Sequence, residues 1–94
     1  MRRSVLTDDL DHCIVCGREA VNMHHIFFGI NRKNADADGY MIPLCYWHHM
    51  GPDGIHFNKE LELRWKREGQ KYFESSHTRK EFIKRYGRNY LDGK

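Results

Sequence analysis

The sequence of 94 residues contains no apolar run of about eighteen residues, the length that a helix needs to cross a membrane. A secretory signal is not expected either, because Asp8 and Asp9 lie where its apolar stretch would be. The chain is also too short for two domains that each have a core. These absences argue against membrane proteins and two-domain enzymes, and they predict a single soluble domain in the cytoplasm.

Cysteine is scarce, and its number is odd. An odd set of thiols without an export signal argues against a disulfide framework. A chain of this size buries only about 60 to 70% of its unfolded surface, so its core needs additional stabilisation. Histidine is abundant by contrast, with seven residues that include adjacent pairs at 24–25 and 48–49. Bound metal is therefore the leading candidate for that stabilisation.

Positive charge is concentrated in the second part of the chain. Residues 1–58 contain five Lys and Arg against seven Asp and Glu, whereas residues 59–94 contain eleven against six. A basic part that follows a part rich in metal ligands suits a protein that binds a polyanion beside a metal centre. The alternative is a pair of solvated amphipathic helices, and charge alone does not separate these two interpretations.

Two short strands are predicted in the first part of the chain. Residues 20–28 are rich in Val, Ile and Phe and are followed by Gly29, and residues 40–44 form a second apolar run. Pro43 restricts the second strand to an edge position. Residues 31–39 are polar and contain Asn, Asp and Gly, which predicts a loop. The two strands would then form a hairpin.

Two helices are predicted in the second part. Asn58 is a favourable N-cap for a helix of about four turns. Thr78 and Glu81 have the spacing of a capping box for a second helix, and residues 82, 86 and 90 share its core-facing side. We therefore expect an α+β fold with three parts, which are an N-terminal arm (1–12), a metal-binding core (13–58) and a basic helical extension (59–94).

Cysteine and histidine also occur in two pairs with the same spacing. Cys13-x-x-Cys16 is followed by glycine, as in a zinc knuckle, and Cys45-x-x-His48 repeats the two-residue gap. Three thiolates and one imidazole complete a tetrahedral structural zinc site. The spacing therefore predicts that these four residues bind Zn²⁺. The substitutes for His48 are His12 and His49.

The first histidine pair lies in the predicted strand of residues 20–28. Adjacent residues of a strand face opposite ways, so His24 and His25 are poorly placed to bind one ion together. One can bind a metal while the other acts on a second target, as a metal ligand does beside a general base. The pair therefore indicates chemistry in addition to metal binding.

Three motifs together carry a resemblance to a known family: Cys13-x-x-Cys16, His24-His25-Ile26 and Pro43-Leu44-Cys45-x-x-His48-His49. They resemble the HNH nuclease superfamily over about residues 13–58. The resemblance implies a zinc-stabilised ββα-metal core and a metal-dependent endonuclease that hydrolyses phosphodiester bonds. It also implies that His24 and His49 bind one catalytic divalent cation, and that His25 is the general base that activates water.

Phosphodiester hydrolysis has requirements that these residues fit. A neutral imidazole at His25 can take a proton from water near pH 7. One cation held by His24 and His49 would stabilise the charge of the transition state and the leaving 3′ oxygen. Imidazole ligands suit several ions, so the catalytic cation can be Mg²⁺, Mn²⁺, Ni²⁺, Co²⁺ or Zn²⁺.

The sequence departs from the usual pattern of the superfamily at two places. Many members have asparagine at the head of the second strand, where this sequence has Tyr40, and that role is unassigned. The glycine-rich turn of residues 51–54 also interrupts the segment after the last metal motif. His56 beyond that turn is a third ligand of the catalytic cation, a phosphate contact or a polar residue near a helix cap.

The basic extension is expected to contact the phosphate backbone of nucleic acid. The candidate contacts on exposed helix faces are Arg64, Lys66, Arg67, Lys84 and Arg85. The aromatic residues among them recur at helical spacing, which favours a core role. Residues 82–91 also resemble the tail of small phage and prophage members of the superfamily. DNA is favoured over RNA as the substrate, and the protein would act as a monomer or a homodimer.

Two other classes of function remain open from the sequence. One is a catalytically inactive, zinc-containing module that binds nucleic acid, which the missing asparagine favours. The other is a structural zinc domain that binds protein. A pure binder has no need of His25 beside His24, and a protein partner does not require the basic extension.

Overall fold

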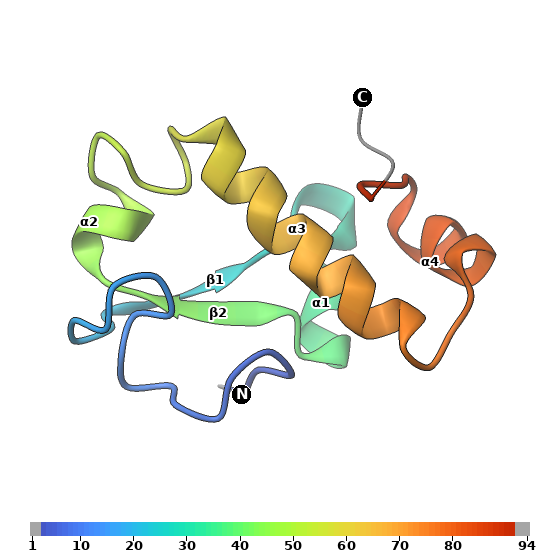
Figure 1. Cartoon of the computed structure of the whole chain (residues 1–94), viewed down its shortest axis with the longest axis horizontal. Helices are drawn as coiled ribbons and strands as arrows, with labels where there is room; N and C mark the ends of the chain where they lie inside the picture. Colours follow the sequence, from blue (N-terminus) through green and yellow to red (C-terminus); the bar gives the residue numbers. More distant parts are fainter. Residues whose placement is uncertain (1–2, 92–94) are drawn as a thin grey trace.

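The computed structural model describes residues 3–91 and has a small α+β architecture, as predicted (Figure 1). The elements in chain order are β1 (Asn22–His25), the 3-10 helix η1 (Gly29–Asn31), α1 (Arg32–Asp38), β2 (Met41–Leu44), α2 (Tyr46–His49), α3 (Lys59–Glu74) and α4 (Arg79–Tyr86). Among these described residues, no helix is long and apolar enough to cross a membrane.

The two strands form one antiparallel sheet in which His24 lies opposite Ile42 and His25 lies opposite Met41. Both strands are shorter than the predicted runs of residues 20–28 and 40–44. All four residues of β2 are buried, including Pro43. A two-stranded sheet has only edge strands, so the proline leaves no central ladder incomplete.

The prediction of a loop over residues 31–39 was wrong, because this segment contains α1. Polar side chains and the final glycine indicated a loop, but Ala35 and Ala37 favour helix and the glycine is its C-terminal cap. Gly39 has a φ of +81°, and its N–H bonds to the carbonyl of Ala35. The strands are therefore joined by a helix instead of a hairpin loop.

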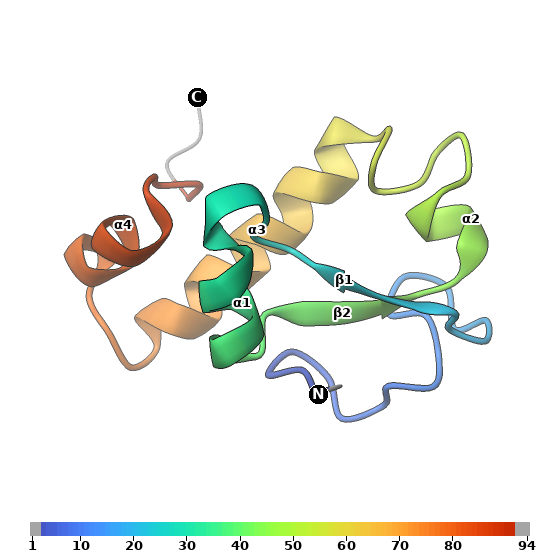
Figure 2. The same cartoon turned by 180° about the vertical axis from the view of Figure 1, so that it is seen from behind.

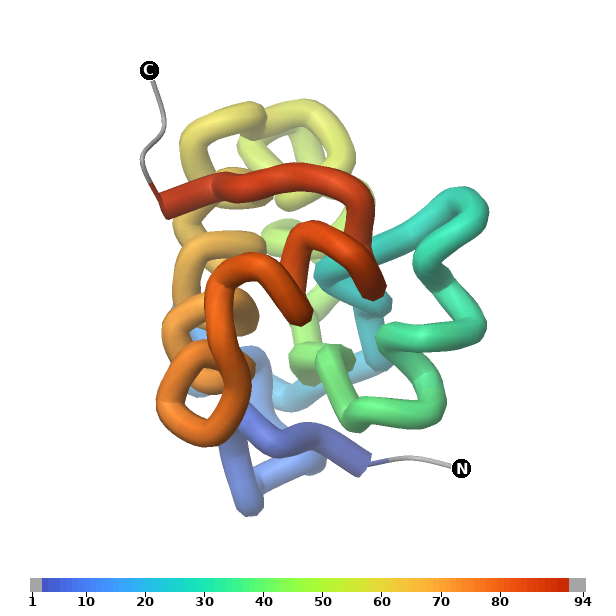
Figure 3. The backbone as a smooth tube through the Cα atoms, turned by 90° about the vertical axis from the view of Figure 1, so that its right-hand side faces the viewer, coloured from blue at the N-terminus to red at the C-terminus, as the bar shows by residue number. Residues whose placement is uncertain are grey.

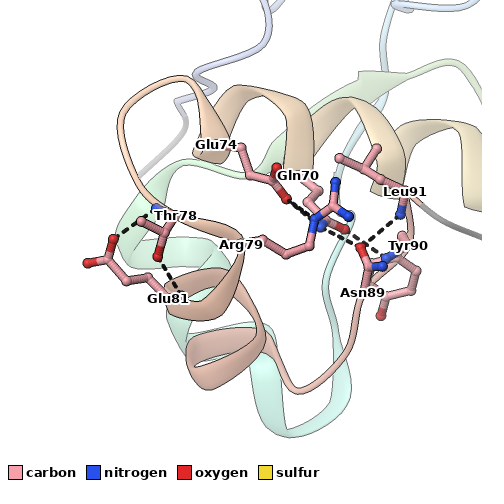
Figure 4. Close-up of polar contacts among 8 residues, drawn as sticks. All are labelled: Gln70, Glu74, Thr78, Arg79, Glu81, Asn89, Tyr90 and Leu91. Atoms are coloured by element: carbon pink, nitrogen blue, oxygen red, sulfur yellow. Dashed lines mark hydrogen bonds and ion pairs between the residues drawn. The ribbon is translucent and has the colours of Figure 1, made fainter.

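The two long helices begin where the sequence predicts. The side chain of Asn58 accepts a hydrogen bond from the Leu61 N–H at the start of α3. The capping box between Thr78 and Glu81 is complete at the start of α4 (Figure 4). The predicted core face of the last segment is confirmed, since its three aromatic residues are buried: Phe82, Tyr86 and Tyr90.

The helices surround the sheet on several sides. Helix α3 crosses one face of the sheet, and α1 lies on the other side of it (Figures 1 and 2). Helix α4 covers the end of the molecule that is remote from α2 (Figure 3). Phe27, two residues beyond β1, fills the centre of the core, where its ring packs on Tyr40, Phe82 and Tyr86. Aromatic packing thus connects the end of β1 to α4.

Side-chain contacts also hold α1 against α4. The amides of Asn31 and Asn34 donate to the carbonyls of Tyr86 and Arg85, respectively. The carboxylate of Asp38 accepts two hydrogen bonds from the Arg85 guanidinium, at 2.6 and 2.9 Å, and one from the Tyr86 hydroxyl. Helix α1 is only 7 residues long, so tertiary contacts of this kind are needed to stabilise it.

The described part of the N-terminal arm also packs on the core. The Val5 N–H donates to the carbonyl of Gly39 over 2.9 Å. Val5 and Leu6 are partly buried against the hydrophobic cluster. The arm therefore covers the turn between α1 and β2.

A buried polar residue joins the C-terminal segment to α3. Gln70 is fully buried, and its amide donates to Glu74 and to Asn89, both at 2.7 Å (Figure 4). Its carbonyl oxygen accepts from the Tyr90 N–H at 2.8 Å. Every polar atom of this side chain is thus satisfied, as burial requires.

Replacing Gln70 by methionine should destabilise the protein by about 1 to 3 kcal/mol, because the volume is kept while the Tyr90 N–H loses its buried acceptor. The matched control is Lys71→Met at the next, exposed position, which should change the stability by less than about 0.5 kcal/mol. Urea unfolding of the three proteins measures both effects. Equal stability of the two variants would contradict the role given to Gln70.

Candidate metal centres

Three cysteines and one histidine meet at one end of the sheet, as their spacing predicts. One ligand atom from each of Cys13, Cys16, Cys45 and His48 lies within 4.8 Å of the others. The Sγ atoms of Cys16 and Cys45 are 3.7 Å apart, and His48 Nδ1 is 3.4 Å from Cys45 Sγ and 3.7 Å from Cys13 Sγ. A tetrahedral zinc ion with ordinary bond lengths requires edges of about 3.8 Å between sulfurs and about 3.6 Å between sulfur and nitrogen. This cluster can therefore hold a metal such as zinc.

Local structure delivers these ligands from two separate segments. The first pair lies on a tight turn in which the Gly17 N–H bonds to the Cys13 carbonyl, and Gly17 has a φ of +81°. The Ile14 N–H donates to Pro43, which ties this turn to β2. Cys45 is the N-cap residue of α2, so His48 follows it by almost one helical turn on the same side.

The thiols of the first pair differ, because the pKa of Cys13 is lowered whereas hydrogen bonds with Cys45 and Cys13 help to raise the pKa of Cys16. Burial acts to raise the pKa of the Cys13 thiol, but hydrogen bonds from the backbone of Cys45, Cys16 and Val15 outweigh burial and lower the pKa. Thiolates are the form that binds metal. Three sulfur donors and one imidazole nitrogen therefore fit a thiophilic cation.

A second cluster contains His24, His49 and His56, each of which contributes one ring nitrogen within 4.8 Å of the others. His49 Nε2 and His56 Nε2 are 3.1 Å apart. Two cis nitrogen ligands of one ion lie about 3.0 to 3.4 Å apart, depending on the coordination geometry. A direct hydrogen bond between these two atoms would also account for their distance, but it leaves out His24, and within residues 3–91 His49 Nδ1 is buried without a hydrogen-bond partner. Within residues 3–91, His24 Nε2 is buried without any hydrogen-bond partner, as a ligand atom would be.

Burial keeps two of these histidines neutral. Burial, helped by the nearby imidazoles of His56 and His49, lowers the pKa of His24 to about 3. Burial and His56 also lower the pKa of His49. A neutral imidazole retains the lone pair that a metal requires. The cluster is therefore ready to bind a cation at neutral pH.

The glycine-rich turn that interrupts the sequence pattern brings His56 to this cluster. The turn folds back on α2, where the Ile55 N–H donates to the His48 carbonyl over 2.7 Å. Gly54 permits the close approach, because a Cβ at this position would lie 2.9 Å from backbone atoms of His49 and Trp47. Of the three roles that the sequence left open for His56, the structure favours that of a ligand.

The two histidines of the first pair have different neighbours, as expected for adjacent strand residues. The ring of His24 contacts the rings of His49 and His56. His25 instead donates from Nε2 to Asp36 Oδ1 on α1, at 3.2 Å, and its side chain is 15% exposed. The resemblance implies a ligand role for His24 and a general-base role for His25, and these two residues have separate surroundings.

Sequence reasoning missed Asp36 because it assigned residues 31–39 to a loop without a role. A surface hollow of about 500 Å³ beside Asp36 is lined also by Arg32 and Lys33. The available signals for a helix here were Ala35 and Ala37, which favour helix, and the glycine that follows them as a C-terminal cap. Tyr40, to which the sequence assigned no role, is buried in the aromatic core, where its ring packs on Phe27.

Another hollow lies elsewhere. It has a volume of about 810 Å³ and is lined by residues of α1, α3, α4 and the turn between α3 and α4, including Tyr72, His77 and Lys84. None of the residues of the two clusters lines it. We give more weight to the clusters, because they combine convergent donors with a buried, unsatisfied nitrogen.

The expected exposure of the basic residues was partly wrong. Arg64 and Lys84 are exposed. The side chain of Lys66 is only 11% exposed, where it pairs with Glu62 and covers the ring of Phe28. Arg67 is partly buried and donates to the Tyr90 carbonyl. Arg85 is exposed as predicted, but it pairs with Asp38. Amphipathic helices bury the stems of such side chains, which spacing alone does not reveal.

Comparisons with family models, curated proteins and solved structures found no match for this chain. Its function must therefore be argued from the geometry of its own residues. The structure offers two separate clusters of side chains that can hold a metal, and one imidazole that is hydrogen-bonded to a carboxylate.

We expect about one tightly bound zinc ion per chain in protein purified without added metal, because zinc binding at such a site is coupled to folding. Cys45→Ser should lose the zinc and unfold the core. The matched control is His12→Ala, an exposed histidine paired with Asp9, which should keep both. Elemental analysis and circular dichroism measure the two properties. Less than about half an equivalent of zinc in well-folded protein would contradict this assignment.

Proposed function

We propose that this protein is a metal-dependent endonuclease of the HNH type that hydrolyses phosphodiester bonds of DNA. The observation that carries the proposal is the division of the first histidine pair between a cluster of imidazoles and a carboxylate. A cation ligand and a proton acceptor next to each other are the two parts that hydrolysis of a phosphodiester needs.

The order and placement of the elements support a ββα-metal core. His24 comes from β1, and His49 comes from the short helix α2 that directly follows β2. Helix α2 also carries His48, so one turn of helix contributes to both clusters. In this proposal the Cys3His cluster stabilises α2, and the three-histidine cluster binds the catalytic cation.

The reaction assigns one task to each part. A bound divalent cation supplies charge stabilisation for the transition state and for the leaving 3′ oxygen. His24, His49 and His56 would hold that cation through one ring nitrogen each. His25 accepts a proton from the attacking water. The partial burial of His25 limits the ways in which its ring can turn, which keeps it oriented for that step.

Positively charged residues on several elements support a nucleic acid substrate. Arg32 and Lys33 lie beside the contact between His25 and Asp36, and Arg64 and Lys84 are exposed on α3 and α4. Cations spread over several elements suit a backbone of phosphates. Sequence preference should be slight, because such contacts carry no information about the bases.

The two members of the histidine pair should respond differently to replacement. His25→Ala should keep the fold, the zinc and the affinity for DNA, but lose a factor of about 100 to 10,000 in cleavage rate, the range for removal of a positioned base. His24→Ala should weaken cation binding, so that more divalent cation restores part of the rate. Nicking of supercoiled plasmid over a titration of divalent cations measures both variants.

The cation titration also identifies how this proposal would fail. If wild-type protein binds DNA but does not cut it with any divalent cation, the protein is an inactive binding module. If it cuts and only His25→Ala shifts the cation midpoint, the roles of ligand and base are exchanged between His24 and His25.

The binding of DNA should weaken as the salt concentration rises. The double replacement of Arg64 and Lys84 by alanine should lower the slope of log K against log salt by about 2, because each lost phosphate contact releases about one counterion fewer. Arg85→Ala is the control next to Lys84, and it should reduce thermal stability more than the slope, since its guanidinium holds Asp38. Fluorescence anisotropy at several salt concentrations gives the slopes, and a slope unaffected by the double replacement would exclude these contacts.

A further inference from the structure

We propose that Asp36 is the positioning residue of His25, and that the proton acceptor of the reaction is therefore His25 Nδ1. This inference rests on the proposed function, since it assigns an atom to the general base. It names a residue on α1 and one ring nitrogen, neither of which the motifs of the sequence identify.

The contact itself determines the tautomer. An ionised carboxylate can only accept hydrogen bonds, so the nitrogen 3.2 Å from Asp36 Oδ1 must carry the proton. That nitrogen is Nε2, and a neutral imidazole has only one N–H. The lone pair is then on Nδ1. An exposed aspartate is ionised at neutral pH in any case, and the hydrogen bond to His25 is the main cause that lowers the pKa of Asp36 further.

Asp36 does not have the placement of a cation ligand. It belongs to neither cluster that can hold a metal within residues 3–91. A carboxylate alone would also repel a phosphate, but Arg32 and Lys33 line the same hollow and offset its charge. Its one polar partner of catalytic interest is His25, so its effect on the reaction passes through that ring.

Helix α4 determines where this carboxylate lies. Asn31, Asn34 and Asp38 attach α1 to residues 85 and 86, on both sides of Asp36 along the chain. A helix of 7 residues would not hold its position without such contacts. The C-terminal helix thus supports the orientation of a base that lies on β1, although it contributes no residue to either cluster.

The test is a double-mutant cycle on cleavage of supercoiled plasmid by the zinc-loaded protein. Asp36→Ala should lower kcat by about 10- to 100-fold, part of the contribution of a positioned base, while KM, zinc content and the cation midpoint stay unchanged. In the His25→Ala background, the same replacement should cost nothing further, because the two residues act as one unit. Additive losses would overturn the proposal.

Two matched controls distinguish loss of the Asp36 carboxylate from two other effects, which are a weaker helix α1 and the removal of one negative charge. Ala37→Gly, at the next position, weakens α1 without touching the carboxylate, and Asp8→Ala removes an equal charge from the arm. Both should keep kcat. Asp36→Asn retains an acceptor oxygen and should recover part of the rate that Asp36→Ala loses. A loss with Ala37→Gly equal to that with Asp36→Ala would show that only the helix matters, and would overturn the proposal.

A spectroscopic measurement tests the tautomer without an activity assay. Nitrogen-15 chemical shifts of the His25 ring should report a proton on Nε2 in the wild-type protein and a mixture of tautomers in Asp36→Ala. A proton on Nδ1 in the wild type would overturn this inference and leave the proposed function intact. A wild-type protein that does not cut DNA would overturn both.

Discussion

The meeting of three thiols and one imidazole is the contact on which the rest of the site depends. Cys13 and Cys16 come from a turn before β1. Cys45 is the N-cap residue of α2, and His48 lies near the end of this helix. Thiolates this close repel each other unless a cation lies between them. A helix of 4 residues is also not stable by itself, so this cluster fixes α2 and with it His49.

The opposite end of the sheet is stabilised by aromatic packing, hydrogen bonds and an ion pair. Phe27 follows the histidine pair by two residues and packs on the aromatic residues of α4. The same helix holds α1, and through it Asp36, by hydrogen bonds and an ion pair. The cluster that can hold a metal and the partner of His25 are thus stabilised separately. Removal of zinc should disturb α2 first, whereas damage to the core should disturb α1.

Local signals were sufficient for part of this architecture. The N-cap at Asn58, the capping box at Thr78 and the aromatic face of α4 were predicted because each depends on residues a few positions apart. The loop predicted for residues 31–39 was wrong, since a short polar helix has a weak local signal and is stabilised here by α4. The exposure of Lys66 was misjudged for the same reason, because its partners Glu62 and Phe28 lie on another turn and another segment, whereas Arg85 is exposed as predicted.

The sequence by itself predicted that three cysteines and one histidine gather in a group that can hold a metal, because two Cys-x-x-ligand pairs carry their own turn geometry. The structure places His48 in that group, in preference to His12 and His49. The sequence also determined that His24 and His25 face different ways, which follows from the pleat of a strand. Only the tertiary structure decided that His56 joins His24 and His49, and that Asp36 holds His25. Both contacts connect segments whose approach depends on the packing of the whole chain, and no local pattern records such an approach.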